Sequence, residues 1–197
     1  HYGGFNGEKY ESLKEFTALV EKQKRLGADF IKLMISGLMD FDHCGVLTEP
    51  GLAPQIIREA IHIAKDSGFA VMAHANGPET VLPAVEAGVD SIEHGAYLDR
   101  ETLEAMAEAK TVWVPTLSAV GNLRGTGRFD EKEVEKILES AMENVNTFAS
   151  LGGILAPGSD AGAWAVPHGG GTEYGLLEEA RGTDCGKLLD RGIQTVE

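Results

Sequence analysis

Two histidines and an aspartate in this sequence follow short segments that have the composition of strands. His74 and His94 come directly after two such segments, and Asp160 comes shortly after a third at 154–156. Imidazole nitrogens and carboxylate oxygens bind Zn²⁺ and similar ions, and both groups also transfer protons. Delivered together from strand ends, these residue types predict the chemistry of a metal-dependent hydrolase.

A lysine is a fourth residue that could take part in the chemistry. Lys32 lies in the middle of the apolar segment 29–35, which we predict to be a buried strand. A buried cation costs free energy unless something neutralises it. Two functional interpretations do so: carbamylation, which gives a carboxylate able to bridge two cations, or a neutral amine that acts as a nucleophile. The structural alternative is a lysine that reaches solvent at a strand end.

Short strand patterns alternate with amphipathic helical patterns along the chain. We expect strands at 29–35, 69–73, 89–93, 111–114 and 154–156. We expect helices at 8–25, 53–67, 78–87, 99–109, 130–150, 173–180 and 186–195, and a flexible loop at 118–128. Because hairpin signals are absent, the pattern predicts right-handed parallel crossovers.

Two architectures satisfy this α/β pattern: an open doubly wound sheet, and a partial (β/α)8 TIM-type barrel of about five parallel β/α units. A full barrel takes about 250 residues, so a chain of 197 residues would lack three units. No GxGxxG motif follows a predicted strand, which argues against a dinucleotide-binding sheet. In both architectures the C-terminal strand ends share one rim, so we expect His74, His94 and Asp160 to converge.

Several further residues could belong to such a rim. His168 lies on the same Gly-rich loop as Asp160, and whether it lines the pocket is left open. We expect His43 to lie on a surface loop, and Trp113 and Trp164 to serve in packing. A single histidine after a strand more often packs or hydrogen-bonds than binds a metal, so the metal prediction depends on the histidine pair and the aspartate together.

The composition limits the class of partner. The chain has a formal net charge of -14, so its field repels nucleic acid and anionic membranes. No apolar run approaches the roughly 20 residues of a membrane span. Its two cysteines, Cys44 and Cys185, lack a metal-binding spacing, which favours a reducing compartment. We expect a cytoplasmic enzyme domain with a small-molecule substrate and without a nucleic acid or membrane partner. A homo-oligomer is compatible with this composition.

Four short motifs resemble successive strand ends of one enzyme superfamily. They are GADFIKLM at 27–34, AHANG at 73–77, SIEHG at 91–95 and GSDAG at 158–162. In this order they resemble the amidohydrolase superfamily, most closely its imidazolonepropionase-related and prolidase-like branch. The resemblance covers nearly the whole chain, and it implies a (β/α)8 barrel that holds one or two divalent metal ions, commonly Zn2+.

The resemblance also implies roles for single residues. Lys32 is expected to be a carboxylated lysine that bridges two metals from the fourth barrel strand. His74 and His94 are expected to be metal ligands of the fifth and sixth strands. Asp160, after the eighth strand, is expected to bind metal and to act as the general acid and base.

One departure from the superfamily pattern matters. Its first-strand His-x-His pair, which binds the more buried metal, is absent, because no two histidines here stand two positions apart. The chain resembles barrel strands four to eight only. We therefore expect residues 1–197 to be a single partial barrel domain without the first three β/α units, either the C-terminal part of a longer enzyme or a degenerate homologue.

The expected function is metal-dependent hydrolysis of an amide-type C–N bond in a dipeptide, an N-acyl amino acid or a cyclic amide. Asn76, His168 and the loop at 36–50 would contact the substrate. With half of the metal shell absent, this chain alone is expected to have little or no activity. Two alternatives stay open: a Schiff-base lyase with Lys32 as the nucleophile, and a non-catalytic remnant or binding protein of the same fold.

Overall fold

One parallel sheet organises residues 7–181, which are the residues that this computed structural model describes. Its strands are β1 (Phe30–Met34), β2 (Ala70–Ala75), β3 (Ser91–His94), β4 (Val112–Val114) and β5 (Ile154–Leu155). They pair in the order β1-β2-β3-β4-β5, each parallel to the next. The predicted series of parallel β/α units is confirmed.

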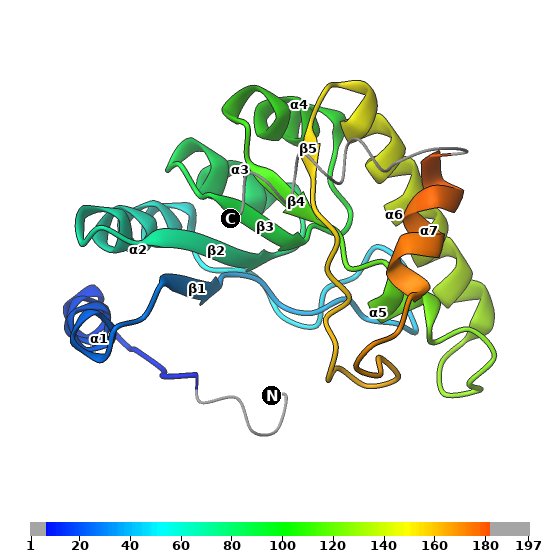
Figure 1. The fold of residues 1–197 in the computed structure, drawn as a ribbon, viewed down its shortest axis with the longest axis horizontal. Coiled ribbons are helices and arrows are strands. Elements are labelled where there is room, and N and C mark those ends of the chain that lie inside the picture. The colour runs from blue at the N-terminus through cyan, green and yellow to red at the C-terminus, as the bar shows by residue number, and fades with distance from the viewer. Residues whose placement is uncertain (1–6, 182–197) are drawn as a thin grey trace.

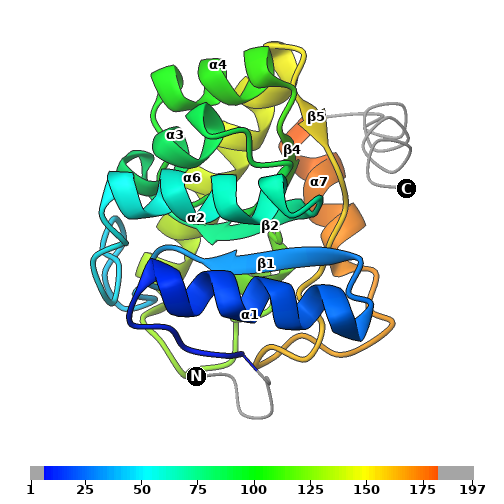
Figure 2. The same cartoon turned by 90° about the vertical axis from the view of Figure 1, so that its left-hand side faces the viewer.

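The helices are α1 (Leu13–Leu26), α2 (Pro54–Asp66), α3 (Pro78–Glu86), α4 (Arg100–Ala109), α5 (Ser118–Gly121), α6 (Glu131–Ser150) and α7 (Thr172–Arg181). None of these described helices has both the length and the apolar character needed to cross a membrane. Figure 1 shows α2, α3 and α4 on the outer side of a curved sheet, and Figure 2 shows α1 beside α2. A strand order that follows the sequence, with helices outside the curve, is that of a partial TIM-type barrel rather than a doubly wound sheet.

The two faces of the sheet carry different residues, because successive side chains of a strand point to opposite sides. The side chains facing the helices form the main core, and they include Ile31, Leu33, Val71, Ala73, Ile92, Trp113 and Leu155, each at most 8% exposed. On the other face, the register aligns Lys32, Met72, Ser91, Val112 and Ile154 in one row, and Met34, His74, Glu93 and Val114 in the next. In a closed barrel this second face is the interior.

The apolar sequence of β1 predicted a strand buried on both faces, and this prediction is wrong. Its burial alternates, with Ile31 and Leu33 buried and the other positions exposed. Lys32 shares its face with Phe30, which is 47% exposed, and Met34, which is 56% exposed. Lys32 itself is exposed, so the cost of burying a cation does not apply to it here.

Some element boundaries differ from the sequence expectation for local reasons. Helix α1 begins only at Leu13, because the Ser12 hydroxyl accepts a hydrogen bond from the backbone N–H of Glu15 at 3.3 Å and caps the helix. The segment 118–128, predicted to be a flexible loop, begins with the short helix α5. The predicted helix at 186–195 lies outside the described residues.

Candidate active site

A cavity of about 630 Å³ lies at the C-terminal ends of the strands. Its lining includes Lys32 from β1, His74 from β2, His94 from β3 and Asp160 from the loop after β5. In β/α barrels this rim carries the functional residues. The structure thus brings to one cavity the three side chains that were predicted to converge, together with Lys32, and their individual roles remain predictions.

The two histidine rings are in direct contact, with ring centroids 4.6 Å apart and an interplanar angle of 63°. His74 Nε2 lies 3.2 Å from the carbonyl oxygen of Gly37. Nε2 also lies 3.4 Å from Asn76 Nδ2, but its shorter contact is to a carbonyl, which only accepts; this contact assigns the hydrogen to Nε2 and leaves Nδ1 with a free lone pair. His94 Nδ1 lies 2.7 Å from Thr116 Oγ1, which leaves Nε2 of His94 as its nitrogen for a ligand.

This arrangement matches what metal-binding histidines need. Such residues bond one ring nitrogen to a protein oxygen, which fixes the ring, and give the other nitrogen to the metal. Burial lowers the pKa of His74, and burial lowers the pKa of His94 to about 3. Both rings are therefore neutral near pH 7, which is the protonation state that binds metal.

The pair does not by itself make a complete metal site. Within residues 7–181, His, Cys, Asp and Glu side chains form no group of three or more that could hold a metal ion. Zinc sites use about three or four protein ligands. The imidazole pair thus fits a divalent ion, and further donors, such as Asp160 and Lys32 on the same cavity, are needed to complete its coordination.

Backbone strain marks the same rim. His94, Thr116 and Asp160 have φ angles of 70°, 52° and 56°, in the left-handed region that residues other than glycine rarely adopt. Each such residue costs about 1–3 kcal/mol and persists only where its surroundings impose the conformation, typically at functional sites. The strain is an observation independent of residue type, and it coincides with the predicted site.

Trp113 stabilises the backbone at His94 through a hydrogen bond. The indole Nε1–H of Trp113 donates to the carbonyl oxygen of His94 at 2.9 Å. The next residue, Gly95, has φ 61°, and a Cβ there would lie 2.6 Å from Trp113 Nε1. Only glycine allows this approach. As predicted, Trp113 is a packing residue, 1% exposed, and it also contacts the backbone of the site.

The predicted substrate contacts have different surroundings. Asn76 lines the cavity but is 1% exposed, and its amide is engaged at both ends. Its Nδ2 donates to the carbonyl of Gly37 at 3.1 Å, and its Oδ1 accepts from the backbone N–H of Ala96 at 2.9 Å. Asn76 therefore ties the loops after β1 and β3 together. His168 is exposed and is not among the described residues that line the cavity.

One wall of the cavity is aromatic, and the sequence reasoning missed it. Phe41, Phe129 and Trp164 line the cavity together with Arg128. The Arg128 guanidinium lies 4.1 Å from the ring centroid of Trp164 and 5.2 Å from that of Phe129. Trp164 packs against Arg128, as expected of a loop residue, but it is 50% exposed and also lines the cavity. The available signal was the position of these residues on loops after β1, β4 and β5, which share the rim.

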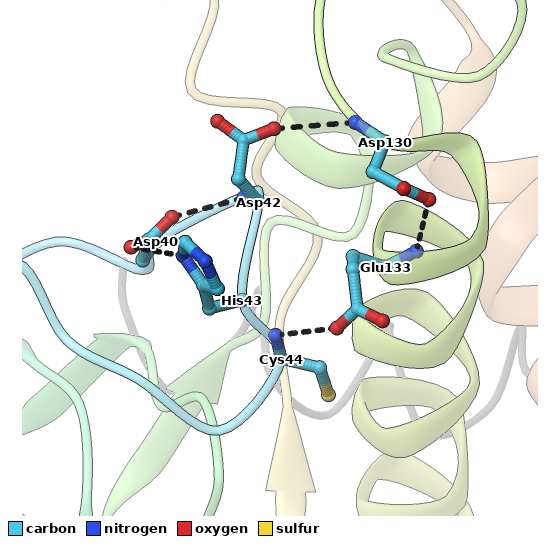
Figure 3. A network of polar contacts seen from close by, with 6 residues as sticks. All are labelled: Asp40, Asp42, His43, Cys44, Asp130 and Glu133. Atoms are coloured by element: carbon cyan, nitrogen blue, oxygen red, sulfur yellow. Dashed lines mark hydrogen bonds and ion pairs between the residues drawn. The ribbon is translucent and has the colours of Figure 1, made fainter.

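The loop after β1 is anchored over the cavity by a polar network, shown in Figure 3. Asp42 accepts a hydrogen bond from the backbone N–H of Asp130 at 3.2 Å, and Glu133 accepts one from the backbone N–H of Cys44 at 2.9 Å. These bonds dock the loop on the first turn of α6, and they bring Phe41 to 5.2 Å from Phe129 between ring centroids.

His43 belongs to the same network without facing the cavity. Its ring bonds Asp40 at 2.9 Å, and its side chain is 71% exposed. The hydrogen bond to Asp40 raises the pKa of His43. The predicted surface position is confirmed.

Comparison with known sequences identifies similar proteins. The sequence profile of the Amidohydrolase family matches residues 8–176. Ochratoxinase from Aspergillus niger is 26% identical over 190 residues, a match that covers 86% of this chain and 38% of the relative. An uncharacterized protein of Mycobacterium tuberculosis is 28% identical over 165 residues and covers 81% of this chain and 44% of the relative. The chain spans less than half the length of these curated relatives.

Comparison with solved structures gives a consistent result. A Xaa-Pro dipeptidase with bound methionine in its active site superposes with a TM-score of 0.76 at 27% identity, over 93% of this chain and 46% of that one. A putative prolidase from Bifidobacterium longum superposes with a TM-score of 0.74 over 96% of this chain and 50% of that one. At 23% identity, the second match supports the fold alone.

Proposed function

Because the chain belongs to the amidohydrolase family, we propose that the protein hydrolyses an amide-type C–N bond of a small molecule with a divalent metal ion, most simply Zn²⁺. The observation that carries the proposal is the contact pair of His74 and His94, each with one ring nitrogen bonded to protein and the other left for a ligand. A hydrolase is the activity class that the family and its similar members support.

The residues of the cavity suggest a division of labour. When bound, the ion polarises the scissile carbonyl and makes an attacking water more acidic. His74 and His94 would hold it. Asp160 would accept the proton of that water and pass it to the leaving nitrogen. The Lys32 amine, on the same sheet face as His74, would add CO₂ with loss of one proton, and the resulting carbamate would bind metal.

The walls of the cavity support a substrate that is part apolar and part anionic. Phe41, Phe129 and Trp164 offer apolar surface. Arg128 stacks on two of these rings and forms no ion pair with any described residue. A guanidinium binds a carboxylate through two parallel hydrogen bonds. Among the candidate substrates, this favours a dipeptide or an N-acyl amino acid over a cyclic amide, in keeping with the similar Xaa-Pro dipeptidase.

The sheet supports the proposal that residues 1–197 form one partial barrel domain. Among the described strands, β1 pairs only with β2, and the interior face of β1 exposes Phe30 and Met34. Three further β/α units would pair with β1, cover this face and supply the remaining metal ligands. Cysteine usage supports a cytoplasmic location as part of the same proposal.

The alternative is a non-catalytic binding protein of the same fold. It is favoured by one observation, the lack of a three-donor cluster within residues 7–181. The intact protein decides between the two when it is purified with zinc, its metal content is measured, and amine release from dipeptides and N-acyl amino acids is followed. Hydrolysis that a chelator abolishes and zinc restores supports the proposal. A protein that binds no metal and releases no amine overturns it.

A further inference from the structure

Glu173, in the first turn of α7, is a buried carboxylate that neither the cavity lining nor the proposed mechanism uses. It is 2% exposed. Its Oε1 accepts from the backbone N–H of Leu117 at 3.1 Å, and its Oε2 accepts from the backbone N–H of Ser118 at 2.7 Å and from the Ser118 hydroxyl at 2.8 Å. Burying a carboxylate is costly unless donors satisfy it, and all these donors come from one turn.

That turn, residues 116–118, lies just after β4 and contacts two segments of the candidate metal site. Thr116 Oγ1 lies 2.7 Å from Nδ1 of His94. The Ser118 hydroxyl, whose single hydrogen is shared with Glu173 Oε2, also lies 3.0 Å from the carbonyl oxygen of Ser159, the residue before Asp160. A single turn of chain therefore contacts a predicted metal ligand and the backbone that leads into the predicted general base.

The conformation of the turn needs an external support. Thr116 has φ 52° and is 4% exposed. A β-branched residue in this region is an outlier, and such strain persists only where neighbouring groups impose it. Glu173 binds the two consecutive N–H groups that follow Thr116, so it holds the backbone at the strained position. The strained backbone of Asp160, φ 56°, is connected to the same support through Ser159.

We propose that Glu173 is a positioning residue that acts through the turn 116–118. The turn, held by its hydrogen bonds to Glu173, orients the His94 ring through Thr116, so that Nδ1 of His94 bonds Thr116 and Nε2 is directed to the cavity. It also fixes the backbone that leads into Asp160. The catalytic meaning of this inference rests on the proposed function, whereas the orientation of the ring does not depend on it.

The first test compares Glu173→Gln with Glu178→Gln, a matched control that removes the same charge from an exposed position of the same helix. In the metal-free intact protein, imidazole ¹⁵N shifts report which His94 nitrogen carries the hydrogen. We expect one tautomer in the wild type and the control, and a mixture in Glu173→Gln. Zinc affinity, measured by competition with a chelating dye, should fall about 10- to 100-fold in Glu173→Gln only.

Two milder changes test separately the contact to His94 and the contact to Ser159, and both leave the Glu173 carboxylate in place. They keep the inference testable if Glu173→Gln does not fold. Thr116→Val removes the hydroxyl and should reproduce the His94 mixture, and Thr116→Ser should restore the single tautomer. Ser118→Ala should lower kcat through Asp160 and leave the His94 signals unchanged.

The outcomes distinguish this inference from the proposed function. If Glu173→Gln and Thr116→Val lower the melting temperature but leave the His94 ring signals as in the wild type, Glu173 is merely structural and the inference is wrong. If the wild type binds no zinc and hydrolyses no amide, the proposed function is wrong, and the His94 ring signals still decide whether Glu173 positions that ring.

Discussion

The helix-facing side of the sheet and its C-terminal rim are built from the same strands by opposite means. On the helix-facing side, apolar residues such as Ile92 and Leu155 are fully buried among other apolar side chains. At the rim, buried polar groups such as Asn76 and Glu173 bond to loop backbone, and residues other than glycine occupy the left-handed region. Burial of apolar surface stabilises the first region, whereas the second stores strain that the first must offset.

This difference teaches where stability and chemistry reside in the chain. Substitutions at the rim should leave the barrel and its helix layer folded, because the rim contributes little of the buried apolar surface. Substitutions in the two regions should therefore affect different measurements, and each prediction below tests that separation.

The largest expected effect is at the rim, in Asp160→Asn. The amide keeps the shape of the side chain but accepts no proton, so we expect the rate of amide hydrolysis by the intact protein to fall about 10²- to 10⁴-fold. The melting temperature should stay within a few degrees of the wild type, because Asn also tolerates the left-handed conformation. An unchanged rate would remove Asp160 from the mechanism.

The matching change in the core is Phe148→Ala. Phe148 is 0% exposed and contacts Trp113 with ring centroids 5.3 Å apart. Its truncation should lower the free energy of unfolding by about 3–5 kcal/mol, measured by urea titration. Zinc affinity per folded molecule should be retained. A selective loss of zinc binding in a stable protein would show that the two regions are not separable.

A smaller effect is expected at the aromatic wall, in Arg128→Gln. If the guanidinium binds a substrate carboxylate, its removal should raise KM for carboxylate substrates about 10- to 100-fold, as for a lost charge-assisted hydrogen bond of about 1.5–3 kcal/mol. Substrates with an amidated C-terminus serve as the control and should be hydrolysed equally by both proteins. An equal change for both substrate types would exclude carboxylate recognition by Arg128.

A pH dependence of stability also originates at the rim. Burial lowers the pKa of His94 to about 3, so between about pH 6.5 and pH 3 the unfolded chain binds more protons at this position than the folded chain. His94 therefore stabilises less as the pH falls through this window, by at most about 1.4 kcal/mol per pH unit.

The measurement is the free energy of unfolding of the metal-free protein against pH, compared with His94→Gln. The comparison is needed because burial raises the pKa values of Glu93 and Glu173, which act in the opposite direction. Relative to His94→Gln, the wild type should lose stability as the pH falls below 6.5. A constant difference would contradict the buried neutral state of His94.

Much of the fold could be predicted from local sequence. The helices expected at 99–109 and 130–150 begin one residue later, at Arg100 and Glu131, because Asp99 and Asp130 cap them; helix starts are predictable because the signal needs only a few neighbouring residues. The convergence of His74, His94 and Asp160 followed from their positions after strands, once parallel connections were expected. The exposed face of β1 was missed, because apolar composition indicates a strand but not which of its faces other elements cover.

The sequence by itself determined the order of strands and helices and the residue types at the strand ends, because hydrophobic period and caps act over a few residues. Only the tertiary structure decided which distant loops meet: Arg128 with Trp164, and Glu173 with the turn 116–118. Such contacts depend on the path of the whole chain around the sheet, and no local pattern of residues encodes that path.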